Sequence, residues 1–131
     1  LQRWASGLAK ALAKRSHKNL SKKELVVVFV TTAEMRRMNK TYRGKDYATD
    51  VLSFESMEET VVGELVLCLD VLHQQAKRTG LSKRGELGYM IVHGVLHLLG
   101  YDHETSAQAE AEMFALQDQI FGELEKTVGF K

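Results

Sequence analysis

Short apolar runs along the chain predict three strands. The run "ELVVVFVT" (24–31) is rich in β-branched residues, which favour a pleated, half-buried strand. The runs "VLSFE" (51–55) and "VVGELVLCLD" (61–70) have the same character, and the stretch "SMEET" (56–60) between them predicts a connecting loop. We therefore expect a small sheet built from these three segments.

Amphipathic stretches before, between and after these runs predict five helices. In the first one, apolar residues at positions 4, 8, 11 and 12 form a helical stripe. Two of the others end at Gly80 and Gly100, since glycine commonly follows the last turn of a helix. The five predicted helices cover about 1–18, 33–42, 71–79, 82–99 and 106–122. Because one helix separates the first two strands, this order predicts an α+β fold, a small mixed β-sheet with helices packed around it.

Length and composition predict one domain with a single core. At 131 residues, 44% of them hydrophobic, the chain can bury such a core, and we take 1–131 as a single domain. No apolar run reaches the roughly 18 residues of a membrane span, so no membrane partner is expected. The one cysteine, Cys68, excludes an internal disulfide and fits a reducing compartment. We expect a cytoplasmic protein, or a mitochondrial one in a eukaryote, because the acid-free residues 1–18 also fit a transit peptide.

The charges are separated along the chain although they nearly cancel. Residues 1–45 hold twelve basic and two acidic side chains, a net charge of +10, whereas the remainder holds six basic and fifteen acidic ones, a net charge of −9. Such a separation predicts either a basic face suited to a polyanion or lysine-rich helix surfaces that are merely solvated. Charge alone leaves both interpretations open.

Three histidines in "HGVLHLLGYDH" predict a metal site on a central helix and the turn after it. His93 and His97 lie four residues apart, so they share one helix face, and Gly100 lets the chain turn back to bring in His103. Three neutral imidazoles suit zinc, although they do not exclude nickel, copper or iron. Three protein ligands leave a coordination position open, as catalytic zinc sites do.

Gly94 distinguishes this motif from a zinc protease. The protease pattern H-E-x-x-H-x-x-G-x-x-H has its catalytic glutamate where this chain has Gly94, so peptide hydrolysis lacks its usual base. A phosphodiester needs a metal and a cation that holds the phosphate, and the basic half of the chain can supply the cation. We expect Asp102, next to His103, to orient a metal ligand; a proton acceptor is the alternative.

Beyond these arguments, "HGVLHLLGYDH" closely resembles the signature of the YbeY family, metal-dependent endoribonucleases of ribosomal RNA maturation in bacteria and organelles. The segment "MNKTYRGKDYATDVLSF" resembles the second hallmark of that family, and "GELVLCLD" resembles its following strand. The resemblance implies that His93, His97 and His103 bind one metal ion, usually zinc, with another divalent transition metal as an option. It also implies that Arg43 serves catalysis beside a cleft that takes RNA.

The same resemblance implies the biological role and the partners. It predicts a single-strand-specific endoribonuclease that processes small-subunit rRNA near its 3′ end and takes part in ribosome quality control. RNA and the ribosome or its small subunit would be the partners, with no small-molecule cofactor. The family's usual N-terminal strand is not found before the first predicted helix, and Glu55 and Glu64 replace a proline and an aspartate.

Two other functions remain open at this point. The first is a metal-dependent hydrolase of another substrate, such as a protease whose base comes from elsewhere. The second is a non-catalytic module in which zinc stabilises the fold and the basic face binds rRNA or the ribosome.

Overall fold

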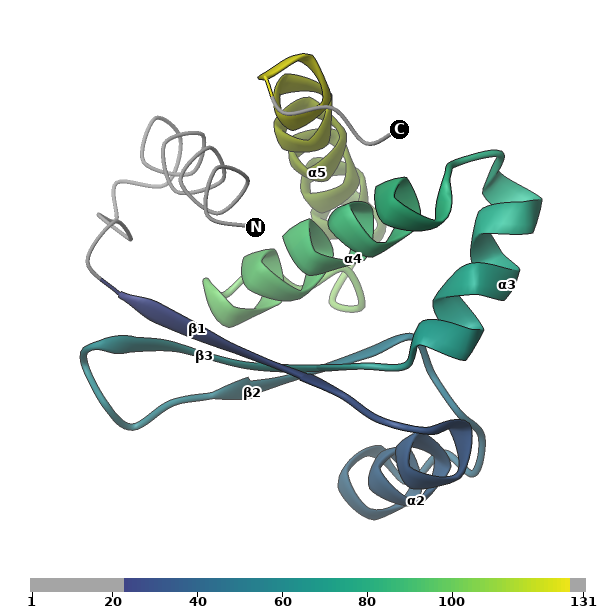
Figure 1. Cartoon of the computed structure of the whole chain (residues 1–131). Coiled ribbons are helices and arrows are strands. Elements are labelled where there is room, and N and C mark those ends of the chain that lie inside the picture. Colours follow the sequence, from purple (N-terminus) through teal and green to yellow (C-terminus); the bar gives the residue numbers. More distant parts are fainter. Residues whose placement is uncertain (1–22, 128–131) are drawn as a thin grey trace.

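The computed structural model of the chain describes residues 23–127 (Figure 1). The helix expected within residues 1–18 lies outside the described residues. The elements in chain order are β1 (Glu24–Phe29), α2 (Thr32–Arg43), β2 (Val51–Glu55), β3 (Val61–Leu67), α3 (Leu69–Thr79), α4 (Lys83–Leu98) and α5 (Ala107–Thr127). Within this part of the chain, no helix is both long and apolar enough to cross a membrane.

The three strands form one mixed sheet in the order β1-β3-β2. Strand β1 runs parallel to β3 and pairs Val27 with Leu65, while β2 runs antiparallel to β3 and pairs Ser53 with the same Leu65. The parallel pair requires a crossover connection, which α2 begins, whereas β2 and β3 join through the loop at 56–60. The predicted α+β fold with a small mixed sheet is confirmed.

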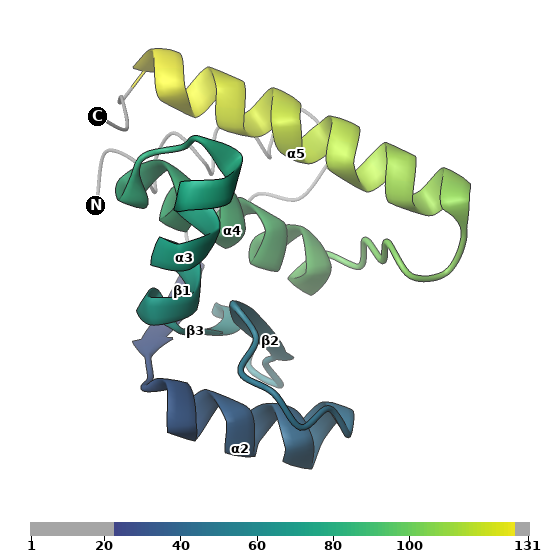
Figure 2. The ribbon, with the colours of Figure 1, turned by 90° about the vertical axis from the view of Figure 1, so that its right-hand side faces the viewer.

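Helices cover both faces of this sheet. Figures 1 and 2 show α4 on one face with α5 beyond it, and α2 on the opposite face. Alternate side chains of a strand point to opposite faces, so Leu65 and Leu67 join the core under α4 and α5, whereas Val66 and Cys68 join a smaller core with Met35 of α2. Helix α4 therefore lies between the sheet and α5 and is buried along most of its length.

Several predicted boundaries were wrong, beginning with the first strand, which was expected to reach residue 31 and ends at Phe29. The third strand was expected to reach residue 70, but it ends at Leu67, and α3 begins at Leu69 rather than at 71. Leu72 and Ala76 are buried at helical spacing, so packing against the core continues the helix back to Leu69. Likewise α5 passes the expected end at Gly122 and reaches Thr127, because Leu124 still packs in the core.

Candidate metal centre

The three histidines of the motif meet at the C-terminal end of α4. His93 and His97 are contributed by the helix, and His103 comes from the turn after it. One ring nitrogen from each lies within 4.8 Å of the others, and the ring centroids are 4.7 to 5.3 Å apart. These side chains can therefore offer three nitrogen ligands to one metal ion, the arrangement that the spacing predicted.

Gly100 makes this arrangement possible. Its φ of 102° lies in the left-handed region, which a residue with a side chain rarely adopts. The backbone N–H of Gly100 donates to His97 O at 3.0 Å, and the N–H of Tyr101 donates to Leu96 O at 3.1 Å, so the end of α4 is closed by a tight turn. Tyr101 packs against the main core, and the chain then doubles back to place His103 over the helix.

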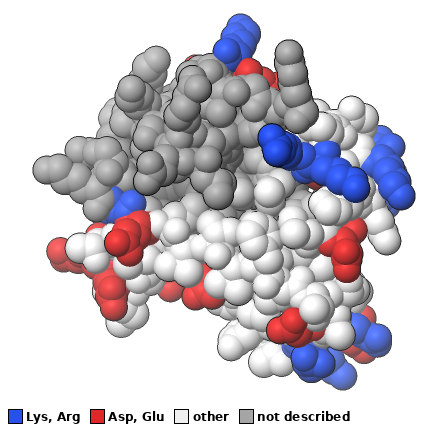
Figure 3. Space-filling model, viewed as in Figure 1, with Lys and Arg blue, Asp and Glu red and all other residues white. Residues whose placement is uncertain are grey.

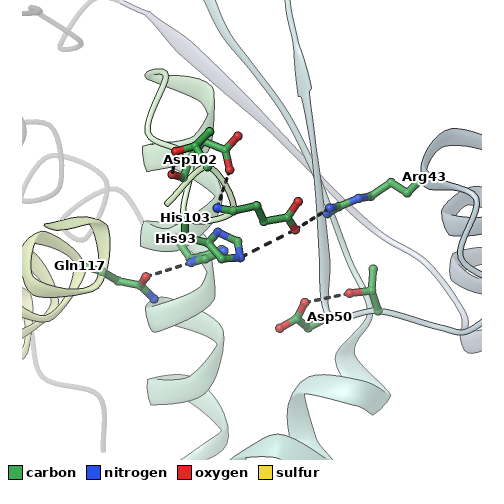
Figure 4. Close-up of polar contacts among 9 residues, drawn as sticks. Arg43, Asp50, His93, Asp102, His103 and Gln117 are labelled. Carbon is green, nitrogen blue, oxygen red and sulfur yellow. Dashed lines mark hydrogen bonds and ion pairs between the residues drawn. The ribbon is translucent and has the colours of Figure 1, made fainter. Parts of the chain in front are cut away.

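Gln117 of α5 fixes one of these rings and was missed by the sequence reasoning. Its Oε1 lies 2.9 Å from Nδ1 of His93, and the side chain is fully buried (Figure 4). A signal was present in the sequence, because position 117 falls on the same helical stripe as the buried Met113, Ile120 and Leu124. A glutamine on an otherwise apolar stripe indicates a buried polar partner.

Burial keeps the two helix histidines neutral. Desolvation lowers the pKa of His93, against the hydrogen bond that the ring donates to Oε1 of Gln117, which favours the charged ring. Burial also lowers the pKa of His97, and the neighbouring His93 and His103 lower it further. Both rings therefore keep an unprotonated nitrogen at neutral pH, as metal coordination requires.

His103 provides an independent test of whether the site fits a metal ion. Its Nδ1 is buried and has no hydrogen-bond partner among the residues that the structure describes. A buried polar atom without a partner is unfavourable and calls for an explanation. A metal ion held with His93 and His97 would satisfy this atom, so the donor set fits the implied metal.

Arg43 brings a cation next to the histidines. It is the last residue of α2, and its Nη2 donates to Oε1 of Glu104 at 2.9 Å. The same Glu104 oxygen lies 4.0 Å from Nε2 of His103, so the guanidinium is one side chain away from the candidate metal centre (Figure 4). The structure thus brings Arg43 next to three histidines that lie 50 or more residues further along the sequence.

Asp102 contacts the backbone of the turn that carries His103. Its Oδ1 accepts a hydrogen bond from the backbone N–H of Glu104 at 2.8 Å, and the residue is exposed. This contact sets the path of the chain around His103. The expectation that Asp102 orients a metal ligand stays a prediction, and the hydrogen bond to the ring of His93 is made by Gln117.

Position 94 faces the sheet. A Cβ built on Gly94 would lie 2.6 Å from Cδ2 of Leu65 and 3.3 Å from Oγ of Ser53, and that hydroxyl donates to Gly94 O at 3.3 Å. Leu65 is fully buried, so its side chain has no free space to enter. This backbone therefore has no room for the glutamate of the protease motif.

On the face drawn in Figure 3, most of the basic side chains of the described residues gather in two places. Figure 3 shows Lys and Arg beside α2, where Arg36 is paired with Asp46, and over the corner at which α3 meets α4. The corner residues are all exposed and belong to the half of the chain that is acidic overall: Lys77, Arg78, Lys83 and Arg84. The basic surface is therefore not confined to residues 1–45.

Comparisons with known proteins agree on one family. The family model described as "Endoribonuclease YbeY" matches residues 1–125. The chain is 53% identical over 111 residues to an Endoribonuclease YbeY of Bdellovibrio bacteriovorus, covering 85% of this chain and 74% of that protein. It is 45% identical over 104 residues to another of Paraburkholderia phymatum, covering 77% and 67%. The solution structure of TM1509 from Thermotoga maritima matches with a TM-score of 0.62 at 32% identity, covering 95% of this chain and 83% of that one.

Proposed function

This chain belongs to the YbeY endoribonuclease family, and we propose that it cleaves RNA at a metal ion held by His93, His97 and His103. One observation carries the proposal. The three imidazoles offer nitrogens within 4.8 Å of one another, and the buried Nδ1 of His103 lacks any other partner in the described part of the chain. An endoribonuclease acts on a phosphodiester, so the catalytic glutamate that Gly94 replaces is not required.

We propose zinc as the metal, one ion per chain. Neutral imidazoles are ligands that zinc accepts readily, and three of them leave a position for water or substrate. When bound, such an ion polarises a phosphoryl oxygen or lowers the pKa of a bound water. Another divalent transition metal would use the same ligands, because imidazole also suits copper, nickel and iron.

We assign to Arg43 the binding of the scissile phosphate. A guanidinium matches a phosphate through two parallel hydrogen bonds, and this one already lies beside His103 through its contact with Glu104. A phosphate that takes this place must displace the carboxylate of Glu104. Asp102 would act by holding the turn that carries His103 and Glu104.

The proposed substrate is single-stranded RNA, because its backbone can bend toward a metal held against a helix end. Within the cell, we propose processing of small-subunit rRNA near its 3′ end, with the ribosome or its small subunit as partner. The exposed basic residues of α2 and of the α3–α4 corner would contact phosphates without reading sequence.

The decisive experiment is cleavage of a labelled single-stranded RNA by wild type and by His97→Ala, prepared identically, with zinc and with chelator. His73→Ala is the matched control, because it removes a histidine of α3 that lies outside the cluster. We expect wild type and His73→Ala to cut only with metal, and His97→Ala to bind RNA without cutting it.

Other outcomes would overturn the proposal. Equal cutting by all three proteins would mean a contaminating nuclease. Metal-dependent binding of RNA without cutting by wild type would favour the non-catalytic module. Chelator-sensitive cleavage of a protein substrate would favour a different hydrolase.

A further inference from the structure

We propose that Gln117 is a positioning residue for the metal, which holds the ring of His93 with Nε2 as its free nitrogen. The inference rests on the proposed function, because it concerns how one ligand of the metal is prepared. Gln117 lies on α5, 24 residues after His93, and its Oε1 lies 2.9 Å from Nδ1 of that ring.

The orientation of the Gln117 amide follows from its second contact. Nε2 of Gln117 lies 3.3 Å from the backbone carbonyl oxygen of Tyr89. A carbonyl oxygen can only accept a hydrogen bond, so the NH₂ end of the amide must face Tyr89. The oxygen end of the amide therefore faces His93.

The tautomer of His93 follows in turn. Because Oε1 of Gln117 can only accept, Nδ1 of the neutral ring must carry the hydrogen. The lone pair is then on Nε2, the nitrogen that remains for a metal. Without the hydrogen bond to Gln117, a neutral histidine would populate two tautomers and two ring orientations. Only one of these combinations presents the lone pair of Nε2 to a metal.

The surroundings hold the hydrogen bond between Gln117 and His93 in place. Gln117 is fully buried, and α5 packs along α4 through the same apolar stripe. Phe114, one turn earlier on α5, lies with its ring centroid 6.0 Å from that of His93 and 5.8 Å from that of His103. Helix α5 thus restrains the histidines by one hydrogen bond and two ring contacts, although it contributes none of the three imidazoles itself.

The test compares Gln117→Met, which keeps a similar size and loses the acceptor, with Gln117→Glu, which keeps an acceptor facing Nδ1. Zinc affinity is measured by competition with a chromophoric chelator, without RNA. We expect Gln117→Met to bind zinc about 10- to 100-fold more weakly than wild type, the usual effect of losing such a partner. Gln117→Glu should bind zinc more tightly than Gln117→Met, because a carboxylate also accepts from Nδ1–H, although it loses the hydrogen bond to Tyr89 O.

The matched control is Leu124→Ala, which weakens the same buried stripe of α5 about two turns away. It should lower stability and leave zinc affinity unchanged. A second readout needs no metal: ¹⁵N chemical shifts of the neutral His93 ring should show hydrogen on Nδ1 in wild type and in Gln117→Glu, and a mixture of tautomers in Gln117→Met.

The outcomes separate this inference from the proposed function. Unchanged zinc affinity and tautomer in Gln117→Met would overturn the inference alone. Equal weakening of zinc binding by Leu124→Ala would also overturn it, because the effect would then be one of general stability. If wild type bound neither zinc nor another divalent transition metal while the Nδ1–H tautomer was observed, the proposed function would fail and the hydrogen-bond assignment would stand.

Discussion

Nη2 of Arg43 donates a hydrogen bond to Oε1 of Glu104 at 2.9 Å, which joins the last residue of α2 to the turn after α4. The two residues are 61 positions apart in the sequence, and the contact places a guanidinium beside His103. The carboxylate of Glu104 pairs with the guanidinium at the position proposed for a phosphate. Its negative charge therefore lies where RNA is proposed to enter.

Replacing Glu104 with glutamine should tighten RNA binding. The exchange removes a repulsive charge and weakens the contact that a phosphate must displace. Because exposed ion pairs are worth about 0 to 1 kcal/mol, the gain should be at most about fivefold in the dissociation constant. Fluorescence anisotropy with a labelled single-stranded RNA at fixed salt measures the dissociation constant. The control is Glu125→Gln on α5, which makes the same change of charge elsewhere on the surface. Equal tightening by the control would mean that only net charge matters.

Gly94→Ala should destabilise the protein relative to Gly122→Ala. Both changes add a methyl group to a helix and gain similar helix propensity, but only the first drives a Cβ into Leu65, at 2.6 Å, whereas nothing lies within 4 Å of the second. Overpacking of this kind should make Gly94→Ala less stable than Gly122→Ala by about 1 to 3 kcal/mol. Urea unfolding followed by circular dichroism gives the difference. Equal stabilities would show that Leu65 moves away freely.

The N-terminal cap of α2 should make part of the stability depend on acid pH. Glu34 accepts hydrogen bonds from the backbone N–H and the hydroxyl of Thr31, and the backbone bond is the main cause of its lowered pKa. A carboxyl whose pKa is lowered by folding stabilises above its ordinary pKa of 4.5 and loses that contribution as the pH falls through the lower folded value.

Glu34→Ala should therefore lower the melting temperature at pH 7, and the difference from wild type should shrink as the pH falls below about 4.5. Thermal melts across this range test it. A constant difference for Glu34→Ala down to the lowest pH would contradict the assignment.

Zinc should stabilise the folded protein through the three histidines. A ligand that binds only the folded state at 100 times its dissociation constant adds about 2.7 kcal/mol to the free energy of unfolding. We expect this gain in wild type and in His73→Ala, its reversal by chelator, and its absence in His93→Ala. Denaturant titrations with and without zinc measure it. A gain of the same size in His93→Ala would place the metal elsewhere.

Some of this protein could be predicted from its sequence because the determinants are local. Helix periodicity and turn glycines act over a few residues, so the strand at 51–55 and the helix end before Gly80 follow from the sequence. The histidine cluster is local in the same sense, because one helix and one glycine turn hold all three rings.

The tertiary structure alone decided what surrounds those rings. Gln117 and Glu104 become important through contacts with His93 and Arg43, and no spacing rule connects residues on different elements. The end of β3 at Leu67 was decided in the same way, because burial of Leu72 and Ala76 against the core outweighed the strand preference of "LVLCLD". The sequence by itself determined the cluster of three histidines and the helix that carries two of them, through short-range geometry. The packing of α5, α2 and the sheet decided which ring nitrogen of His93 meets Gln117, which cation lies nearby, and that Gly94 has no room for a side chain.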